Sequence, residues 1–239
     1  MKRLLYLLLI CSFTNGTNLD SLALKYGTDK SSAFHNYTTI YEKYLGPLQQ
    51  KNINFLEIGF AGGYSAHMWD EYFSNQQSKL YFIDINPDCF KYINGLTARC
   101  TLNLVNQANA VELTQWLKLV GDEFDIIIDD GSHQMEHQIT TFKTLFPRLK
   151  KGGIYIIEDL HTSYWRDYGS DGDCQNPQAS PASAIRYLQN LVDDLNFTGA
   201  RTENGNRSKN VQLVEHLNIY QESISSIHFY CSLCFIFKD

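Results

Sequence analysis

The 239-residue sequence lacks a block of basic residues and any hydrophobic run long enough to cross a bilayer. With 20 Lys and Arg against 26 Asp and Glu, the formal net charge is −6, which argues against non-specific nucleic-acid binding. The sequence also lacks the Gly-x-Gly-x-x-Gly pattern of dinucleotide-binding folds and a second Cys-x-x-Cys pair that would complete a zinc site. Hydrophobic residues make up 44%, which is typical of a globular domain with a sizeable core. Composition excludes these classes and names no function.

The amino terminus has the layout of a secretory signal. Lys2 and Arg3 precede an apolar run at 4–11, and small or polar residues follow at 12–17. A charged start, a short apolar middle and a small-residue exit predict a signal peptide over 1–17, because the run has no polar face of the kind expected for an amphipathic helix. Location stays open: exported if the signal functions, otherwise cytoplasmic. We expect a helical segment at 18–50 and one larger domain at 51–239.

Cysteine usage points to no specialised chemistry. Of the six cysteines, Cys11 lies in the predicted signal, so an odd number remains and no full disulfide framework is implied. Cys231 and Cys234 fall in a segment at 227–237 that is typical of a strand or hairpin, and residues three apart on a strand face opposite ways. The sequence therefore predicts buried or half-buried thiols here.

From residue 54 onward, short apolar strands alternate with helical segments. This alternation predicts βαβ units and an α/β fold: a Rossmann-like, mostly parallel sheet with an antiparallel carboxyl-terminal edge. The expected strands are 54–59, 79–84, 102–105, 124–129 and 153–158, with two antiparallel edge strands in 224–237. The expected helices are 64–73, 109–120 and 137–149, with further helix in 19–50. Residues 160–180 are rich in Gly, Asp, Ser and Pro and predict a long loop over the carboxyl edge of the sheet.

Ligands of open parallel sheets bind beyond the carboxyl ends of the strands, and two candidate features lie there. Glu57 and Gly59 introduce a glycine-rich turn that lets a ligand approach the backbone, although a plain tight turn explains it nearly as well. Asp84 ends the second strand and could accept the ribose hydroxyls of a nucleoside cofactor, with a helix cap or turn as the alternative. Together with the sheet pattern, they favour a cofactor site.

Two acidic strand ends give the strongest functional signal. The fourth expected strand ends Asp-Asp-Gly-Ser-His at 129–133, and the fifth ends Glu-Asp-Leu-His at 158–161. If the two strands are neighbours, four carboxylates and two imidazoles converge, and their repulsion favours a hard cation such as Mg²⁺. His133 lies three residues past Asp130, close enough to act on a metal-bound ligand as a general base. Helix capping accounts for one such acid but poorly for two pairs.

Other polar and aromatic residues carry weaker signals. Tyr37, Tyr41 and Tyr44 have helical spacing and are expected in the core. Tyr164 and Trp165, with His161, suggest an aromatic and polar pocket suited to a sugar or polyol, with simple packing of Tyr164 and Trp165 as the alternative. The remaining histidines are expected to be packed or at the surface, not ligands: His35, His67, His137, His216 and His228.

Seven motifs, in order, resemble those of class I S-adenosylmethionine-dependent, metal-dependent sugar O-methyltransferases of antibiotic biosynthesis. The mycinamicin type is the nearest, with rhamnosyl methyltransferase and cephalosporin-hydroxylase-like relatives. The resemblance covers roughly residues 20–238. The motifs begin at Tyr26 (YGTDK), His35 (HxYxxxY), Leu56 (LEIG), Asp84 (DINP), Ile127 (IIDDGSH), Leu145 (LFxxLxxGGIY) and Glu158 (EDLHTSYW).

The resemblance implies an O-methyltransferase that uses S-adenosyl-L-methionine and Mg²⁺ or a similar ion, with a small-molecule or glycan substrate. By that resemblance His133 is the base, and Asp130, Glu158 and Asp159 hold the metal ion. The implied cofactor site consists of Glu57, Gly59, Ser65, Asp84, Gln107 and Asp129.

Two other functions remain in view. An exported, non-catalytic protein could keep the fold and bind a carbohydrate or a partner, although a dead site has no physical need for clustered acids. A nicotinamide-dependent oxidoreductase is disfavoured by Glu57 and by the missing phosphate loop. The acceptor and the oligomeric state, including homo-oligomer formation, stay open.

Overall fold

The structure is a computed structural model that describes residues 18–201 and 216–239. The predicted signal at 1–17 lies outside the described residues. Within them, the strands form a sheet in the order β3-β2-β1-β4-β5-β7-β6. The strands are β1 (Asn54–Ile58), β2 (Lys79–Asp84), β3 (Cys100–Leu104), β4 (Phe124–Asp129), β5 (Leu149–Ile157), β6 (Ile224–Tyr230) and β7 (Leu233–Lys238). The first five pair in parallel, while β7 pairs antiparallel with both β5 and β6.

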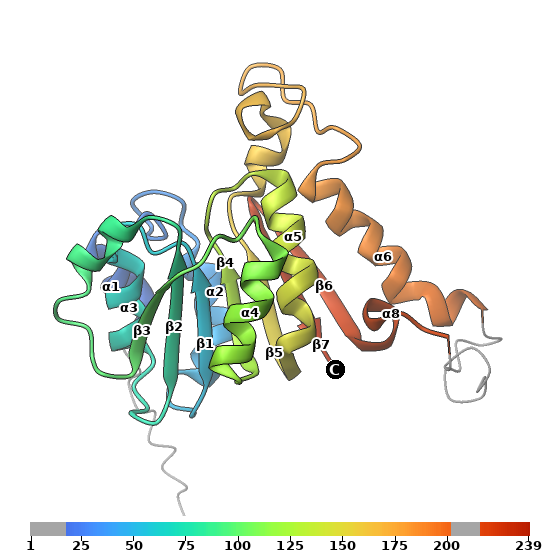
Figure 1. Ribbon diagram of the computed structural model, residues 1–239. Coiled ribbons are helices and arrows are strands. Elements are labelled where there is room, and N and C mark those ends of the chain that lie inside the picture. Colours follow the sequence, from blue (N-terminus) through green and yellow to red (C-terminus); the bar gives the residue numbers. More distant parts are fainter. Residues whose placement is uncertain (1–17, 202–215) are drawn as a thin grey trace, which may run out of the picture.

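Helices cover both faces of this sheet (Figure 1). One core cluster joins Leu56 and Ile127 to helices α4, α5 and α6. A second joins Phe55 and Ile126 to α1, α2 and α3. Neighbouring strand residues thus point to opposite faces, and both faces are apolar, as expected for buried parallel strands. The helices are α1 (Leu19–Tyr26), α2 (Thr38–Leu45), α3 (Tyr64–Tyr72), α4 (Ala110–Val120), α5 (Met135–Leu145), α6 (Ala184–Arg201) and α8 (Ile219–Ser223).

The predicted sheet is confirmed, with corrections at the boundaries. The helix expected at 137–149 is α5, which ends at Leu145 because Pro147 cannot continue it, and β5 begins four residues before the expected start at 153. The third strand lies at Cys100–Leu104, not 102–105. The two antiparallel strands expected in 224–237 are β6 and β7, and they form that edge of the sheet, with β7 next to β5 and β6 outermost.

The segments outside the sheet differ more from the prediction. The helical stretch expected over 19–50 is interrupted by turns between Tyr26 and Thr38, and that interruption carries residues that reach the site. The 160–180 segment is a loop that contains the short 3₁₀ turns Leu160–Tyr164 and Arg166–Tyr168. Helix α6 was not anticipated. No helix in the described part of the chain is both long and apolar enough to span a membrane.

The two cysteines of the carboxyl-terminal hairpin have different environments. Cys234 is buried in β7, as predicted. Cys231 is exposed, so the predicted burial is wrong for this residue. The reason is that Tyr230 pairs with Leu233, which leaves Cys231 in the turn between β6 and β7.

A buried ion pair joins α3 to the residues just before β3 and gives a first prediction. Arg99 Nε donates to Asp70 Oδ1 at 3.0 Å, and Thr97 donates its backbone N–H to Asp70 Oδ2 at 2.7 Å. Burial opposes ionisation of Asp70, but the bonds from Thr97 and the charge of Arg99 outweigh it and lower the pKa of Asp70. We expect Asp70→Asn to lower the free energy of unfolding by about 2 kcal/mol at pH 7.

The pH dependence of this effect follows from the lowered pKa. The ionised Asp70 carboxylate stabilises the folded state fully above about pH 4, the ordinary carboxyl range. This stabilisation is lost as pH falls through the lower folded-state pKa of Asp70. Urea unfolding at pH 7 and at pH 3 checks this. The matched control is Asp88→Asn, whose partner Lys91 lies on the surface. An equal loss of stability at both pH values would contradict the linkage.

Candidate active site

The turn after β1 brings the backbone of two strand ends into contact. Gly59 has φ +93°, and a Cβ there would meet the carbonyl oxygen of Asp130 at 2.1 Å. The Asp130 N–H donates to the carbonyl of Ile58 at 3.0 Å, which joins the ends of β1 and β4. Only glycine has both the backbone freedom and the small size that this approach needs. Strand order reverses between β1 and β4, the place where open sheets bind ligands.

Asp84, at the end of β2, holds the glycine-rich turn. Its Oδ2 accepts the N–H groups of Phe60 at 2.8 Å and Ala61 at 3.0 Å, and its Oδ1 accepts that of Asn86 at 2.8 Å. Burial raises the pKa of Asp84, but the backbone hydrogen bonds outweigh it, so the net pKa lies below the usual value. Asp84 is therefore an ionised group that lines a cavity at the carboxyl edge of the sheet.

Glu57 lies beneath the turn. Its Oε2 accepts from Ser65 Oγ at 2.8 Å, and its Oε1 accepts from Trp69 Nε1 at 3.1 Å. Burial raises the pKa of Glu57 to about 7, although the charge of Lys30 opposes the rise. Glu57 thus supports Ser65 from below, and its own side chain has no exposed surface.

Asp129 is likewise buried, and it fixes a glutamine. Its Oδ1 accepts from Gln107 Nε2 at 3.1 Å, and the side-chain Oε1 of Gln107 accepts the N–H of Ser132 at 2.7 Å. Burial raises the pKa of Asp129 to about 7. The pair therefore orders the Asp-Asp-Gly-Ser turn that follows β4.

Two cavities meet at this edge of the sheet. The first, of about 390 Å³, lies over the ends of β1, β2 and β4; Asp84, Gln107 and Asp130 are among its lining residues. The second, of about 290 Å³, lies between the turns 27–30 and 59–65 and also reaches Asp130. Because Gly59, Ala61 and Asp130 line both, the two form a continuous binding region.

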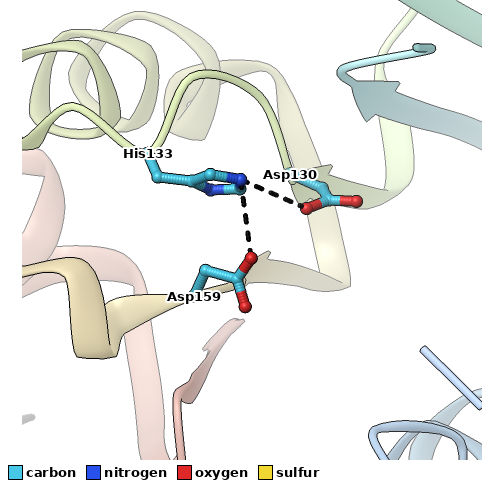
Figure 2. A group of neighbouring side chains, drawn as sticks. All are labelled: Asp130, His133 and Asp159. Carbon is cyan, nitrogen blue, oxygen red and sulfur yellow. Dashed lines mark ion pairs between the residues drawn. The ribbon is translucent and has the colours of Figure 1, made fainter. Parts of the chain in front are cut away.

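Three of the four acids expected to converge at the ends of β4 and β5 do so, namely Asp130, Glu158 and Asp159, because these two strands are neighbours. The fourth, Asp129, bonds Gln107 and belongs to neither acidic group. Figure 2 shows the His133 imidazole facing the carboxylates of Asp130 and Asp159. Its Nε2 lies 3.5 Å from Asp159 Oδ2 and 4.0 Å from Asp130 Oδ1. The three ligand atoms lie within 4.8 Å of one another, a spacing that suits a metal ion. His161 Nδ1 lies 3.9 Å from Asp159 Oδ1.

Backbone conformation singles out the same residues. His133 has φ +58° and Asp159 has φ +54°, in the left-handed region that residues other than glycine seldom adopt. Strain of this kind costs of order 1–3 kcal/mol per residue and gathers at functional sites. Here it turns the imidazole and the carboxylate toward each other.

Sequence reasoning missed three partners of these acids. Tyr37 donates to Asp159 Oδ1 and Tyr41 donates to Glu158 Oε1, each at 2.5 Å. Lys30 forms ion pairs with Asp130 and, at 3.0 Å, with Glu158. The two tyrosines are buried, as expected, but their hydroxyl groups belong to the site. The only signal was the presence of these residues in the motifs at 26–30 and 35–41.

The predicted acceptor residues divide into two sets. His161 and Trp165 are half-buried, and their rings meet edge to face with centroids 4.7 Å apart. Tyr164 instead packs against the core cluster of α5 and α6. Gln138 also belongs to this region, since its Nε2 donates to the carbonyl of Glu158 at 3.0 Å.

The chain is similar in sequence to known methyltransferases. Residues 56–160 match the family model described as a methyltransferase domain. The chain is 32% identical over 227 residues to 8-demethyl-8-alpha-L-rhamnosyl tetracenomycin-C 2'-O-methyltransferase of Streptomyces olivaceus, with 92% of this chain and 54% of the relative covered. It is 31% identical over 228 residues to demethylmacrocin O-methyltransferase of Streptomyces fradiae, with 92% and 53% covered.

A solved structure extends the likeness to three dimensions. The MycE methyltransferase from the mycinamycin pathway, in complex with Mg, SAH and mycinamycin VI, matches with a TM-score of 0.78 at 26% identity. The match covers 94% of this chain and 54% of that one, so the chain spans about half the length of the relatives it matches. This protein is a class I methyltransferase-fold protein and a homologue of the sugar O-methyltransferases of macrolide and tetracenomycin pathways.

Proposed function

We propose that this protein is an S-adenosylmethionine-dependent, metal-assisted O-methyltransferase that acts on a hydroxyl of a sugar or glycosylated small molecule. The observation that carries the proposal is the double role of Asp130. It lines both cavities at the carboxyl edge of the sheet and also belongs to the group it forms with His133 and Asp159. A cofactor in those cavities and an acceptor at that group would meet at Asp130.

The cavities suit the two ends of the cofactor. The larger one offers the Asp84 carboxylate for ribose hydroxyls and Gln107 beside the base. The smaller one offers Gly59 and Ser65 for the methionine end. Glu57 and Asp129 support these residues from beneath. The six predicted cofactor residues therefore act in two layers, one touching the ligand and one holding the turns.

Removing the Asp84 carboxylate tests the nucleoside end. We expect Asp84→Ala to weaken S-adenosylmethionine binding by at least about tenfold, because hydrogen bonds to charged groups contribute about 1.5–3 kcal/mol. Calorimetric titration checks this. The control is Asp88→Asn, because Asp88 is exposed and lies four residues after Asp84; this variant should bind S-adenosylmethionine with wild-type affinity. Unchanged affinity in Asp84→Ala would move the ribose elsewhere.

The donor set also fits a divalent cation. Asp130, Glu158 and Asp159 are the proposed ligands, and carboxylate oxygens are what Mg²⁺ prefers. Both Glu158 oxygens already accept hydrogen bonds, from Tyr41 and Lys30, so Glu158 would use its remaining lone pairs. A bound cation supplies Lewis-acid polarisation of a sugar hydroxyl.

The chain's own residues supply the proton transfer and the orientation. His133 Nε2 takes the proton of the acceptor hydroxyl, and Asp159, 3.5 Å away, stabilises the resulting imidazolium. The acceptor oxygen forms a bond to the methyl carbon as the carbon–sulfur bond breaks, and its electron pair stays on sulfur. Holding the two reactants in line provides much of the rate.

Aromatic rings around Asp159 support a sugar acceptor. Successive ring contacts run from His133 through Tyr168, Trp165, His161 and His35 to Tyr37, with centroids 4.7–6.3 Å apart. Aromatic faces with a few convergent polar groups are typical of small-molecule pockets. The apolar face of a sugar ring would lie against the half-buried rings while its hydroxyls face the acids.

Label transfer from S-adenosylmethionine to a panel of acceptors tests the proposed function. The panel contains methyl α-L-rhamnoside, other deoxysugar glycosides and matched aglycones, each with and without Mg²⁺. We expect Mg²⁺-dependent methylation of glycosides and none of aglycones. Methylation of aglycones alone, or of no acceptor, would contradict the proposal.

We also keep the prediction that residues 1–17 form a secretory signal, which amino-terminal sequencing of the mature protein checks.

A further inference from the structure

Among the described residues, two groups of side chains have metal-ligand spacing, and they share one member. Asp130, His133 and Asp159 form the first group, and Glu57, Asp130 and Glu158 form the second. In each, the ligand atoms lie within 4.8 Å of one another. Asp130 belongs to both groups: its Oδ1 faces His133, and its Oδ2 pairs with Lys30.

The second group already contains a cation from the chain itself. Lys30 Nζ pairs with Asp130 Oδ2, lies 3.0 Å from Glu158 Oε2 and lies 3.7 Å from Glu57 Oε1. The Lys30 side chain is 1% exposed. Its ammonium therefore lies among three carboxylates, where a second metal ion would otherwise be expected.

Burial separates the two groups further. The side chains of Glu57 and Glu158 are 0% and 2% exposed, and other donors hold them as well: Ser65, Trp69 and Tyr41. In the first group the Asp159 side chain is 14% exposed and that of His133 is 21% exposed. A hydrated ion can thus approach the first group, while the second is closed and, with Lys30 present, already neutralised in part.

We propose that Lys30 fills the second of two adjacent cation positions and so limits the acidic edge to one divalent ion. The inference rests on the proposed function, in which that ion binds Asp130 and Asp159 on the open side and takes Glu158, through its remaining lone pairs, as the third ligand. Lys30 is a positioning residue: by holding Asp130 Oδ2 and Glu158, it leaves Asp130 Oδ1 facing His133 and Asp159. The turn between α1 and α2, which carries Lys30, thereby fixes both the geometry and the ion count of the site.

Counting Mn²⁺ ions bound to the full chain tests this proposal without any methyl acceptor. The free ion is measured by electron paramagnetic resonance during titration. We expect one ion per chain in the wild type and two in Lys30→Ala, because the vacated carboxylates accept a second ion. Lys30→Arg, which keeps a positive charge, should again bind one. A merely structural role for Lys30 would not raise the ion count.

A second pair of variants locates the added ion. Asp159→Asn should lose the ion of the open group, while Lys30→Ala/Asp159→Asn should still bind one at Glu57 and Glu158. Two ions in the wild type, or one in a folded Lys30→Ala variant, would overturn the inference and leave the proposed function standing. No ion bound by the wild type would count against both. If Lys30→Ala fails to fold, the wild-type count and Lys30→Arg still decide, since two ions in either contradict the proposal.

Discussion

Replacing His133 with alanine is expected to abolish methyl transfer while leaving cofactor affinity nearly intact. The imidazole lies 3.5 Å from Asp159 on a backbone with φ +58°, and His133 is absent from the lining of both cavities. Loss of a general base lowers rates by about 10²–10⁴-fold. Single-turnover methyl transfer and calorimetric binding of the demethylated cofactor measure the two effects separately.

His216→Ala is the matched control, because that histidine is exposed and outside the site. It should keep the wild-type rate. Loss of cofactor binding in His133→Ala would assign His133 a structural role. A rate within a few-fold of the wild type would exclude it as the base.

Replacing Asp130 with asparagine is expected to have the other large effect. This residue lines both cavities, pairs with Lys30 and faces His133, so the change removes a charge from the point where the proposed cofactor, metal ion and acceptor would meet. We expect divalent-ion affinity and the rate each to fall by about 100-fold or more, since even the outer partners of metal ligands contribute about 10–100-fold. Mn²⁺ titration and the methyl-transfer rate at saturating Mg²⁺ measure the two.

Asp167→Asn provides the control, because this exposed acid lies in the neighbouring 3₁₀ turn and outside both ligand groups. It should bind Mn²⁺ as the wild type does. Wild-type ion affinity in Asp130→Asn would contradict the assignment of Asp130 as a metal ligand, whatever happens to the rate.

The parallel sheet could be predicted from sequence because its central strands β1, β4 and β5 are largely buried and so stand out as short apolar runs. The first and last residues of the helices and strands were harder to predict. The periodicity after His137 continues past Leu145, but Pro147 ends α5, and β5 then begins among the polar residues Lys150 and Lys151. The insertion of β7 between β5 and β6 depends on tertiary pairing, which no local pattern encodes.

The acids of the site could be predicted for a similar reason, because the ends of neighbouring parallel strands meet at one edge. Their partners could not. Lys30 lies 100 residues from Asp130 and 128 from Glu158, and Tyr41 lies 117 from Glu158. A lysine in a polar turn is normally at the surface, and only the packing of the turn after α1 onto the sheet edge buries it.

Calorimetric titration of the folded protein with S-adenosylmethionine, with and without Mg²⁺, tests the central claim most directly. The structure predicts binding at about micromolar affinity, that is about 8 kcal/mol, because Asp84, Gln107 and Ser65 already line ordered cavities. Absence of binding by well-folded protein in both conditions would contradict the account, and the likeness to methyltransferases would then describe ancestry alone.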